Sequence, residues 1–300
     1  MGKALDILKN NKMSALIFNN KEVRVDEDVV RNTLIPRDKE GYKGDFGRVL
    51  VIAGSRGYSG AAFLTTEGVV RSGAGLVTLC IPKELQDIMS IKLTEAMTIN
   101  YEETEKINSI VAKSDVIAIG PGMTNSRLTY NILSETILKS ECPIVIDADG
   151  LNVLQSNLEL LQMKNNQIIL TPHYGEMARL TRMTIDEIKE DKIRIAKKFA
   201  KEHEVILLLK GHRTIITDGS DVFINTTGNS AMASGGMGDV LTGIIASFIA
   251  QGYEPLEATY LATYIHGYCG DKLAETMFCV NASHIIEELP FIIKEIFDRK

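Results

Sequence analysis

The chain has 300 residues, of which 45% are hydrophobic and 24% charged, and its formal net charge is -6 at pH 7. This composition is typical of a globular protein with one large core, and the mild acidic excess argues against a nucleic-acid partner, because binding to phosphate backbones needs clustered basic surface. The start MGKALDILKN lacks the apolar run of a secretory signal, and no stretch reaches the roughly 20 apolar residues of a membrane helix. We therefore expect a cytoplasmic protein with no membrane partner.

Apolar runs of strand length recur along the chain, each bounded by glycine, proline or aspartate. Segments with helical spacing lie between them, the clearest being 185–203, which Thr184 and Glu187 open with the pattern of a capping box. Strands that alternate with helices predict a parallel sheet covered on both faces. We predict strands at 48–53, 76–81, 115–119, 143–147, 167–171 and 205–209.

The pattern changes after the last of these runs. Two short apolar segments, 214–217 and 222–225, flank Asp218-Gly219-Ser220, a hairpin signal that predicts an antiparallel extension of the sheet. Helical spacing then returns over 240–249, where Gly252 suits the end of a helix, and again from Glu254 onward.

The chain shows no linker, repeat or low-complexity segment. We predict one α/β domain over residues 26–300, preceded by an N-terminal extension of residues 1–25. The four cysteines form no CxxC pair, so we expect reduced, structural thiols.

Glycines and polar residues follow the predicted strands at their carboxyl ends. In open parallel sheets the ligand crevice lies outside these ends, so these segments should converge on one cleft. The segments are 54–60 (GSRGYSG), 120–122 (GPG), 147–150 (DADG), 171–176 (TPHYGE) and 210–212 (KGH).

The most informative stretch is GNSAMASGGMGDVLTG, residues 228–243. Its glycine-rich part leads directly into a helix, whose free N–H groups and positive dipole end form an anion site. Asp239 lies at this junction, where an aspartate is also a favoured N-cap. A cap alone does not need a loop stripped of side chains, so we favour a base that deprotonates a hydroxyl attacking a phosphoryl group. We call the loop of Gly235, Gly236, Met237 and Gly238 the anion loop.

Other residues at the strand ends leave alternatives open. Residues 210–214 would place a lysine and backbone amides near a nucleotide, or would form a solvated turn. His173 follows a strand, which favours a ligand contact over a role in the core. The carboxylates of Asp147, Asp149 and Glu176 would organise hydrated Mg²⁺. Alternatively, they would cap helices and form turns. For His203, His212, His266 and His284 we expect structural or surface roles.

Several motifs occur in the order found in one known family. From about Lys43 to Gly252 the chain resembles the ADP- or ATP-dependent NAD(P)H-hydrate dehydratases of the ribokinase-like superfamily. The resemblance implies a three-layer α/β/α sandwich with a mostly parallel central sheet and a short antiparallel extension. It implies dehydration of the S epimer of hydrated NADH or NADPH, with ADP or ATP as phosphoryl donor. From the carboxylates named above we also expect Mg²⁺ as cofactor. The motifs are KGDFGRVLVIAGS, YSGAAFLT, GPG, VIDADGLN, TPHYGEMARL, LKGHRT and GNSAMASGGMGDVLTG.

The resemblance also assigns residues to two ligands. The pocket for the hydrated cofactor would be made by Ala61 or Ala62, Gly122, His173 and Asp239. The adenine nucleotide would lie along Lys210, Gly211, His212, Arg213 and Thr214, and on Gly238. Two prolines of the family pattern are absent, because Ser230 and Tyr174 stand in their places, but no side chain with an assigned role is lost.

The same resemblance bears on partners. It implies a homo-oligomer, often a tetramer, and coupling to a separate epimerase, because only about 40 residues precede the first predicted strand. Two rival functions would use the same anion loop, with or without Asp239 as a base. One is a ribokinase-like kinase for a vitamin precursor, and the other is an adenylate sensor without catalysis. The preference for ADP or ATP, and for NADH or NADPH hydrate, stays open.

Overall fold

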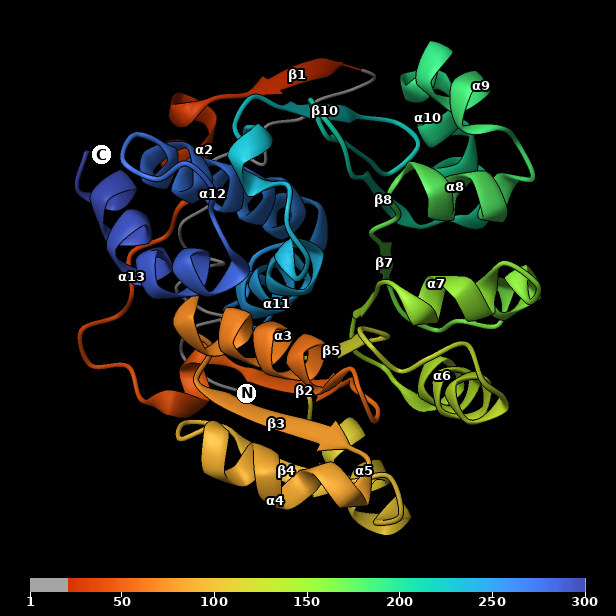
Figure 1. Ribbon diagram of the computed structural model, residues 1–300. Coiled ribbons are helices and arrows are strands. Elements are labelled where there is room, and N and C mark those ends of the chain that lie inside the picture. Colours follow the sequence, from red (N-terminus) through yellow and green to blue (C-terminus); the bar gives the residue numbers. More distant parts are fainter. Residues whose placement is uncertain (1–20, 300) are drawn as a thin grey trace.

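One ten-stranded sheet organises the protein in the computed structural model, which describes residues 21–299 (Figure 1). The strand order is β1-β10-β9-β8-β7-β6-β5-β2-β3-β4. Within the described residues only β9 runs against its neighbours, β8 and β10, which confirms the predicted antiparallel extension of a parallel sheet. The strands are β1 (Glu22–Val25), β2 (Arg48–Ile52), β3 (Leu76–Ile81), β4 (Met97–Asn100), β5 (Val116–Ile119), β6 (Ile144–Ile146), β7 (Ile168–Leu170), β8 (Ile206–Leu209), β9 (Ile215–Thr217) and β10 (Val222–Asn225).

The six predicted apolar runs all form strands, each within one residue of its predicted ends. The two strands at the edges of the sheet, β1 and β4, were not predicted. Edge strands leave part of their surface to solvent, so their sequences lack a continuous apolar run. In β4, for example, Met97 is exposed whereas Ile99 is buried. Strand β1 pairs along its length with β10. Residues 1–20 of the predicted extension lie outside the described residues, and the boundary at residue 25 stays a prediction.

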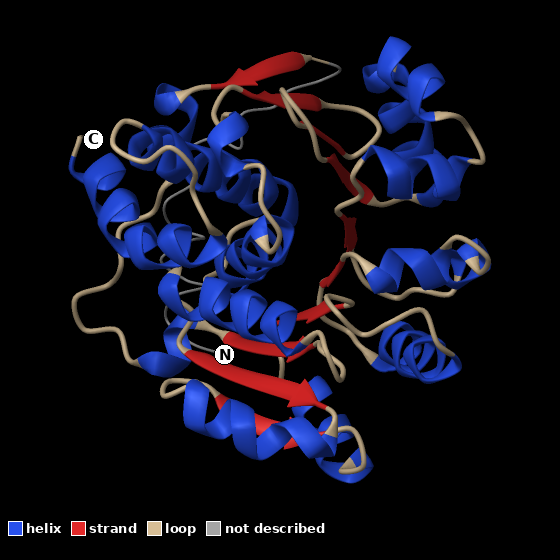
Figure 2. Cartoon of the chain, viewed as in Figure 1, coloured by secondary structure: helices blue, strands red, loops and turns tan. Residues whose placement is uncertain are grey.

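Helices cover both faces of the sheet and give three layers, as predicted (Figures 1 and 2). One face carries α2 (Glu27–Thr33), α3 (Ser59–Arg71), α4 (Lys83–Lys92), α11 (Met237–Ala250), α12 (Pro255–Ala274) and α13 (Ala282–Asp298). The other carries α5 (Thr104–Val111), α6 (Arg127–Lys139), α7 (Asp149–Leu154), α8 (Tyr174–Thr181), α9 (Ile185–Glu190) and α10 (Lys192–His203). Short 3₁₀ turns occur at Lys43–Phe46, Leu158–Gln162 and Ser230–Met232. None of the described helices combines the length and apolar character needed to cross a membrane.

The predicted single helix over 185–203 is wrong in one respect. The helix is interrupted at Asp191, whose φ of -141° and ψ of 55° are not helical, and α10 begins after this residue. The Asp191 side chain accepts a hydrogen bond from the backbone N–H of Arg194, as an N-cap does. The capping box of Thr184 and Glu187 at the start of α9 is confirmed.

The central helix α11 packs closely against α3, and glycines make this contact possible. A Cβ at Gly243 would lie 2.2 Å from the carbonyl oxygen of Thr65, and one at Gly68 would lie 2.7 Å from that of Val240. Two backbones approach this closely only where the Cβ is absent. The contact fixes the amino end of α11, which follows the anion loop, relative to α3, which follows the 54–60 loop.

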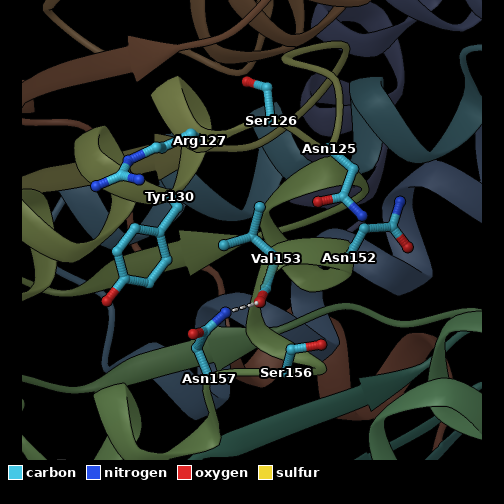
Figure 3. A pocket seen from close by; sticks show the side chains of 8 residues that line it. All are labelled: Asn125, Ser126, Arg127, Tyr130, Asn152, Val153, Ser156 and Asn157. Carbon is cyan, nitrogen blue, oxygen red and sulfur yellow. Dashed lines mark hydrogen bonds between the residues drawn. The ribbon is translucent and has the colours of Figure 1, made fainter.

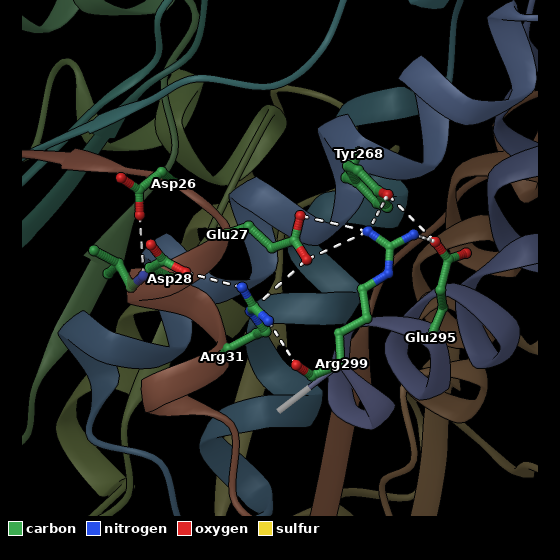
Figure 4. A network of polar contacts seen from close by, with 8 residues as sticks. Asp26, Glu27, Asp28, Arg31, Tyr268, Glu295 and Arg299 are labelled. Carbon is green, nitrogen blue, oxygen red and sulfur yellow. Dashed lines mark hydrogen bonds and ion pairs between the residues drawn. The ribbon is translucent and has the colours of Figure 1, made fainter.

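A polar network joins the carboxyl end of α13 to α2 (Figure 4). Arg299 forms an ion pair with Glu27, with 3.3 Å between Nη1 and Oε1, and another with Glu295. The carbonyl oxygen of Arg299 accepts a hydrogen bond of 2.6 Å from Arg31. Because these groups are partly solvent-exposed, each pair adds at most about 1 kcal/mol, so the network mainly sets where α13 ends.

Candidate active site

The site lies where the strand order reverses, between β2 and β5. The loops that follow these two strands are joined by hydrogen bonds. The N–H of Gly54 donates to the carbonyl of Pro121 over 2.8 Å, and Ser55 Oγ donates to the carbonyl of Gly122 over 2.7 Å. In open parallel sheets ligands bind at such a reversal, outside the carboxyl ends of the strands.

Gly122 leaves room beside the first turn of α3. Its φ is 65°, and a Cβ there would lie 2.9 Å from the Ala61 Cβ and 2.9 Å from the carbonyl oxygen of Tyr58. Ala62 is fully buried and packs under Gly54 instead. Of the two alanines left open by the resemblance, Ala61 is the one that adjoins Gly122, and Ala62 belongs to the core.

The anion loop ends at the amino terminus of α11. Gly236 is the N-cap, with a φ of 91° that favours glycine, and a Cβ there would meet Leu64 at 2.4 Å. Gly235 has nothing within 4 Å of its Cβ position. No side chain caps the helix, so its first N–H groups stay available to an anion. Asp239 is the third residue of α11, and the alternative that it serves as the N-cap is wrong.

The Asp239 carboxyl is half-buried, and no hydrogen bond to it occurs within residues 21–299. Burial, and after it the negative charge of Asp147, raise its pKa to about 7, while the positive charge of Lys210 opposes the rise. A general base works best when its pKa lies near the operating pH. The environment of Asp239 therefore suits proton transfer at neutral pH.

A buried carboxylate ties this region together. Asp147 Oδ1 accepts a hydrogen bond of 2.7 Å from Lys210 Nζ, and Asp147 Oδ2 accepts one of 2.8 Å from Thr242 Oγ1 on α11. Burial by itself would lower the Lys210 pKa, but Asp147 and then Glu176 outweigh it and raise that pKa. A Cβ at Gly238 would lie 3.1 Å from Lys210 Nζ, so the ammonium group sits directly against the anion loop.

His173 and Glu176 form a capping box at the start of α8. His173 Nδ1 accepts hydrogen bonds from the N–H groups of Gly175 and Glu176, at 2.9 and 3.2 Å, while Glu176 Oε2 accepts one from the His173 N–H at 2.9 Å. With Nδ1 an acceptor, the ring proton lies on Nε2. Burial, followed by the charge of Lys210, lowers the His173 pKa, so the ring stays neutral and offers Nε2–H as a donor. Burial raises the Glu176 pKa to about 6.

A cavity of about 440 Å³ opens beside the anion loop. Its walls come from the predicted nucleotide segment 210–214, from the chain between β10 and α11, and from α12. Thr214 Oγ1 closes the turn of that segment by donating to the carbonyl of Gly211 over 2.9 Å. The lining residues are Lys210, Gly211, His212, Arg213, Thr214, Asn225, Thr227, Gly228, Asn229, Ser230, Met232, Met237, Gly238, Leu241, Thr263, His266 and Gly267.

Helix α12 supplies site residues that the sequence analysis missed. Asp271 accepts hydrogen bonds from the Gly228 N–H at 2.9 Å and from Asn229 Nδ2 at 2.7 Å, and so holds the start of the glycine-rich stretch. His266 lines the cavity, and its buried Nε2 has no hydrogen-bond partner within residues 21–299. Burial lowers the His266 pKa to about 4, so this ring is neutral. In the sequence, His266 and Asp271 stand among the apolar residues of a helical pattern. Nothing in that pattern therefore marked either residue as part of the site.

A sequence profile described as NAD(P)H-hydrate dehydratase matches residues 49–291. The chain belongs to the NAD(P)H-hydrate dehydratase family. It is 34% identical to the ADP-dependent (S)-NAD(P)H-hydrate dehydratase of Lactococcus lactis over 278 residues, which cover 91% of this chain and 98% of that one. It is 40% identical to the bifunctional NAD(P)H-hydrate repair enzyme Nnr of Moorella thermoacetica, over 89% of this chain and 53% of that protein. The chain thus spans about half the length of such bifunctional relatives.

A solved structure of the family has the same fold. The ADP/ATP-dependent NAD(P)H-hydrate dehydratase of Bacillus subtilis, co-crystallised with ATP/Mg²⁺, superposes with a TM-score of 0.78 and 30% identity, covering 91% of this chain and 97% of that one. Ribokinase-like structures share the architecture, which confirms the predicted superfamily.

The candidate site carries backbone strain next to its carboxylates. Ala148 has a φ of 49° and Thr124 a φ of 66°, and such non-glycine residues each cost roughly 1–3 kcal/mol. Asp149 accepts a hydrogen bond of 2.8 Å from the Thr124 N–H, which holds the GPG loop against α7. Strain of this kind is kept where the surrounding contacts fix a functional geometry.

The carboxylates proposed for Mg²⁺ are largely engaged. Asp147 and Asp149 accept hydrogen bonds on both oxygens, whereas Glu176 Oε1 lies 3.6 Å from His173 Nε2. Residues 21–299 contain no group of three or more His, Cys, Asp or Glu side chains placed to hold a metal ion. Of these three carboxylates, only Glu176 has an oxygen that accepts no hydrogen bond from residues 21–299. The metal ligands stay a prediction.

Proposed function

We propose that this chain dehydrates the S epimer of hydrated NADH or NADPH at the expense of ADP or ATP. The observation that carries the proposal is the half-buried carboxyl of Asp239, which forms no hydrogen bond within residues 21–299. It lies in the uncapped first turn of α11, where the charge of Lys210 acts on its pKa. Membership of the dehydratase family supports it.

In the proposed reaction Asp239 takes the proton from the ring hydroxyl of the hydrate, and the hydroxyl oxygen attacks the terminal phosphorus of the nucleotide. AMP leaves from ADP, or ADP leaves from ATP. The ring nitrogen then pushes out phosphate, the neighbouring ring carbon loses a proton, and the reduced nicotinamide is restored. Phosphate is a far better leaving group than hydroxide, which is why the nucleotide is consumed.

The surrounding groups have distinct roles in this proposal. The N–H groups of the anion loop and Lys210 stabilise the charge on the transferring phosphoryl group. Asp147 is a positioning residue, because it holds Lys210 and Thr242 together. Gly122 and Ala61 form one wall for the hydrated ring, and His173 donates Nε2–H to it. Residues 210–214 and Gly238 bind the nucleotide.

We further propose that Mg²⁺ accompanies the nucleotide and neutralises phosphate charge, with Glu176 holding it. The ATP/Mg²⁺ used with the B. subtilis dehydratase supports this assignment. The same proposal includes a homo-oligomer in the cytoplasm and coupling to an epimerase that is a separate protein. Bifunctional relatives of about twice the length support the pairing of repair activities.

One assay tests the function against its rivals. The protein is mixed with chemically hydrated NADH, Mg²⁺ and either ADP or ATP, while reduced-nicotinamide absorbance and free phosphate are followed. We expect both to rise together in equal amounts. A stable phosphorylated product without recovery of absorbance would indicate a kinase, and nucleotide binding without turnover would indicate a sensor. Asp87→Asn, an exposed change on α4, serves as the matched control for Asp239→Asn.

A further inference from the structure

A second cavity opens on the other face of the sheet, between α6 and α7 (Figure 3). Its volume is about 440 Å³ and most of its lining is polar. The proposed chemistry at Asp239 uses none of its residues. They are Asn125, Ser126, Arg127, Tyr130, Asn152, Val153, Ser156 and Asn157.

This cavity begins where the GPG loop ends. Asn125 follows Gly122 by three residues, a separation of at most about 11 Å of chain. Asp149 joins the two places, because its Oδ2 accepts from the Thr124 N–H at 2.8 Å and its Oδ1 accepts from Asn152 Nδ2 at 3.2 Å. The cavity wall and the wall of the hydrated-ring pocket therefore form one connected unit.

Several polar groups around the cavity are free to bind. The side chains of Asn125 and Arg127 are exposed and form no hydrogen bond or ion pair within residues 21–299, whereas Asn152 is held by Asp149 and by Arg179. In Figure 3 Arg127 and Tyr130 stand together, across the cavity from Asn125. Cation, ring and amide are thus arranged around one space.

These three groups match the chemistry of an adenosine phosphate. A guanidinium group binds phosphate with two parallel hydrogen bonds. An aromatic ring stacks on a base, and an asparagine amide pairs with the N6 and N7 edge of adenine.

A dinucleotide substrate and a phosphoryl donor must occupy the protein together. The donor fits the cavity around 210–214, which leaves the adenosine end of the substrate to be placed. We propose that the cavity between α6 and α7 binds the adenosine phosphate half of the substrate, with Arg127 on its phosphate and Tyr130 against its adenine. The proposal rests on the proposed function, since it needs a dinucleotide whose nicotinamide ring lies at Gly122.

The test compares a dinucleotide with its half. Wild type, Arg127→Ala and the control Arg24→Ala, an exposed arginine on the edge strand β1, are assayed with hydrated NADH and with hydrated reduced nicotinamide mononucleotide. We expect Arg127→Ala to raise the KM for hydrated NADH about 10- to 100-fold with little change in kcat. The reason is that the variant loses one charge-assisted hydrogen bond to the substrate phosphate. Its KM for the mononucleotide, and both KM values of Arg24→Ala, should stay at the wild-type level.

An equal rise in both KM values, or no rise in either, would overturn the assignment. A wild-type protein that turns over neither hydrate would end the proposed function instead. In that case the cavity is judged by equilibrium binding of NADH and reduced nicotinamide mononucleotide. A loss of NADH affinity alone in Arg127→Ala supports the site, and equal affinities of wild type and variant for NADH overturn it.

Discussion

Replacing Asp239 by asparagine should stabilise the folded protein while it removes activity. The Asp239 pKa lies at about 7 in the folded chain, against an ordinary value of 3.8. The folded state therefore resists ionisation of this carboxyl. Below the pKa of the unfolded chain this carboxyl does not affect the free energy of unfolding. As pH rises from that pKa to the folded pKa the free energy of unfolding falls, and above about pH 7 the full loss is present. Asparagine keeps the shape and removes the charge.

The size of this effect follows from the shift. About three pH units at 1.36 kcal/mol each set an upper limit of about 4 kcal/mol. Because the carboxyl is only half-buried and solvent screens its charge, we expect a gain of about 1–3 kcal/mol at pH 8. The gain should shrink toward zero near pH 4.

Urea unfolding of wild type, Asp239→Asn and Asp87→Asn at pH 8, 6 and 4.5 measures these free energies. The exposed control should show no such pH-dependent gain. A variant less stable than wild type at pH 8, or a gain that is the same at every pH, would refute the electrostatic reasoning.

Three further outcomes are expected. The kcat/KM of the wild type should rise about tenfold per pH unit below 7 and level off above it, because Asp239 must be ionised to act as base; a flat profile from pH 5 to 8 would contradict this. Gly236→Ala should lower the free energy of unfolding, measured by denaturation, by at least about 1 kcal/mol, because of the positive φ at this position and the contact with Leu64. Gly235→Ala should leave the free energy of unfolding unchanged but raise the KM for the nucleotide. Lys192→Met should raise the nucleotide KM about three- to tenfold without changing that of the hydrate, since Lys192 Nζ donates to two carbonyls of the 210–214 turn at 2.9 Å; equal KM changes for both ligands would argue against that role.

Sequence patterns predicted the buried parts of the sheet well, because a strand covered on both faces needs an unbroken apolar run. The hairpin and the helix that begins at Met237 were marked by glycines and by spacing. The edge strands β1 and β4 lack that signal. The break at Asp191 depends on one capping side chain within otherwise continuous helical spacing.

The segments that meet around Asp239 were predictable from the sequence, but the hydrogen bonds that join them were not. Glycines around Asp239 and the polar strand ends indicated which segments meet. The double role of Asp147 could not be seen, because its partners Lys210 and Thr242 lie 63 and 95 residues away. The hydrogen bonds of Asp271 to the glycine-rich stretch likewise arise only when α12 packs beside it.

The most direct test of the account is the rate of phosphoryl transfer in a single turnover of Asp239→Asn. Enzyme in excess is mixed with hydrated NADH and ATP·Mg²⁺ at pH 8, and ADP formation is timed in wild type and variant. ATP should still bind to the variant, while the transfer rate should fall by about 10² to 10⁴. Transfer at close to the wild-type rate would contradict the assignment of Asp239 as the base.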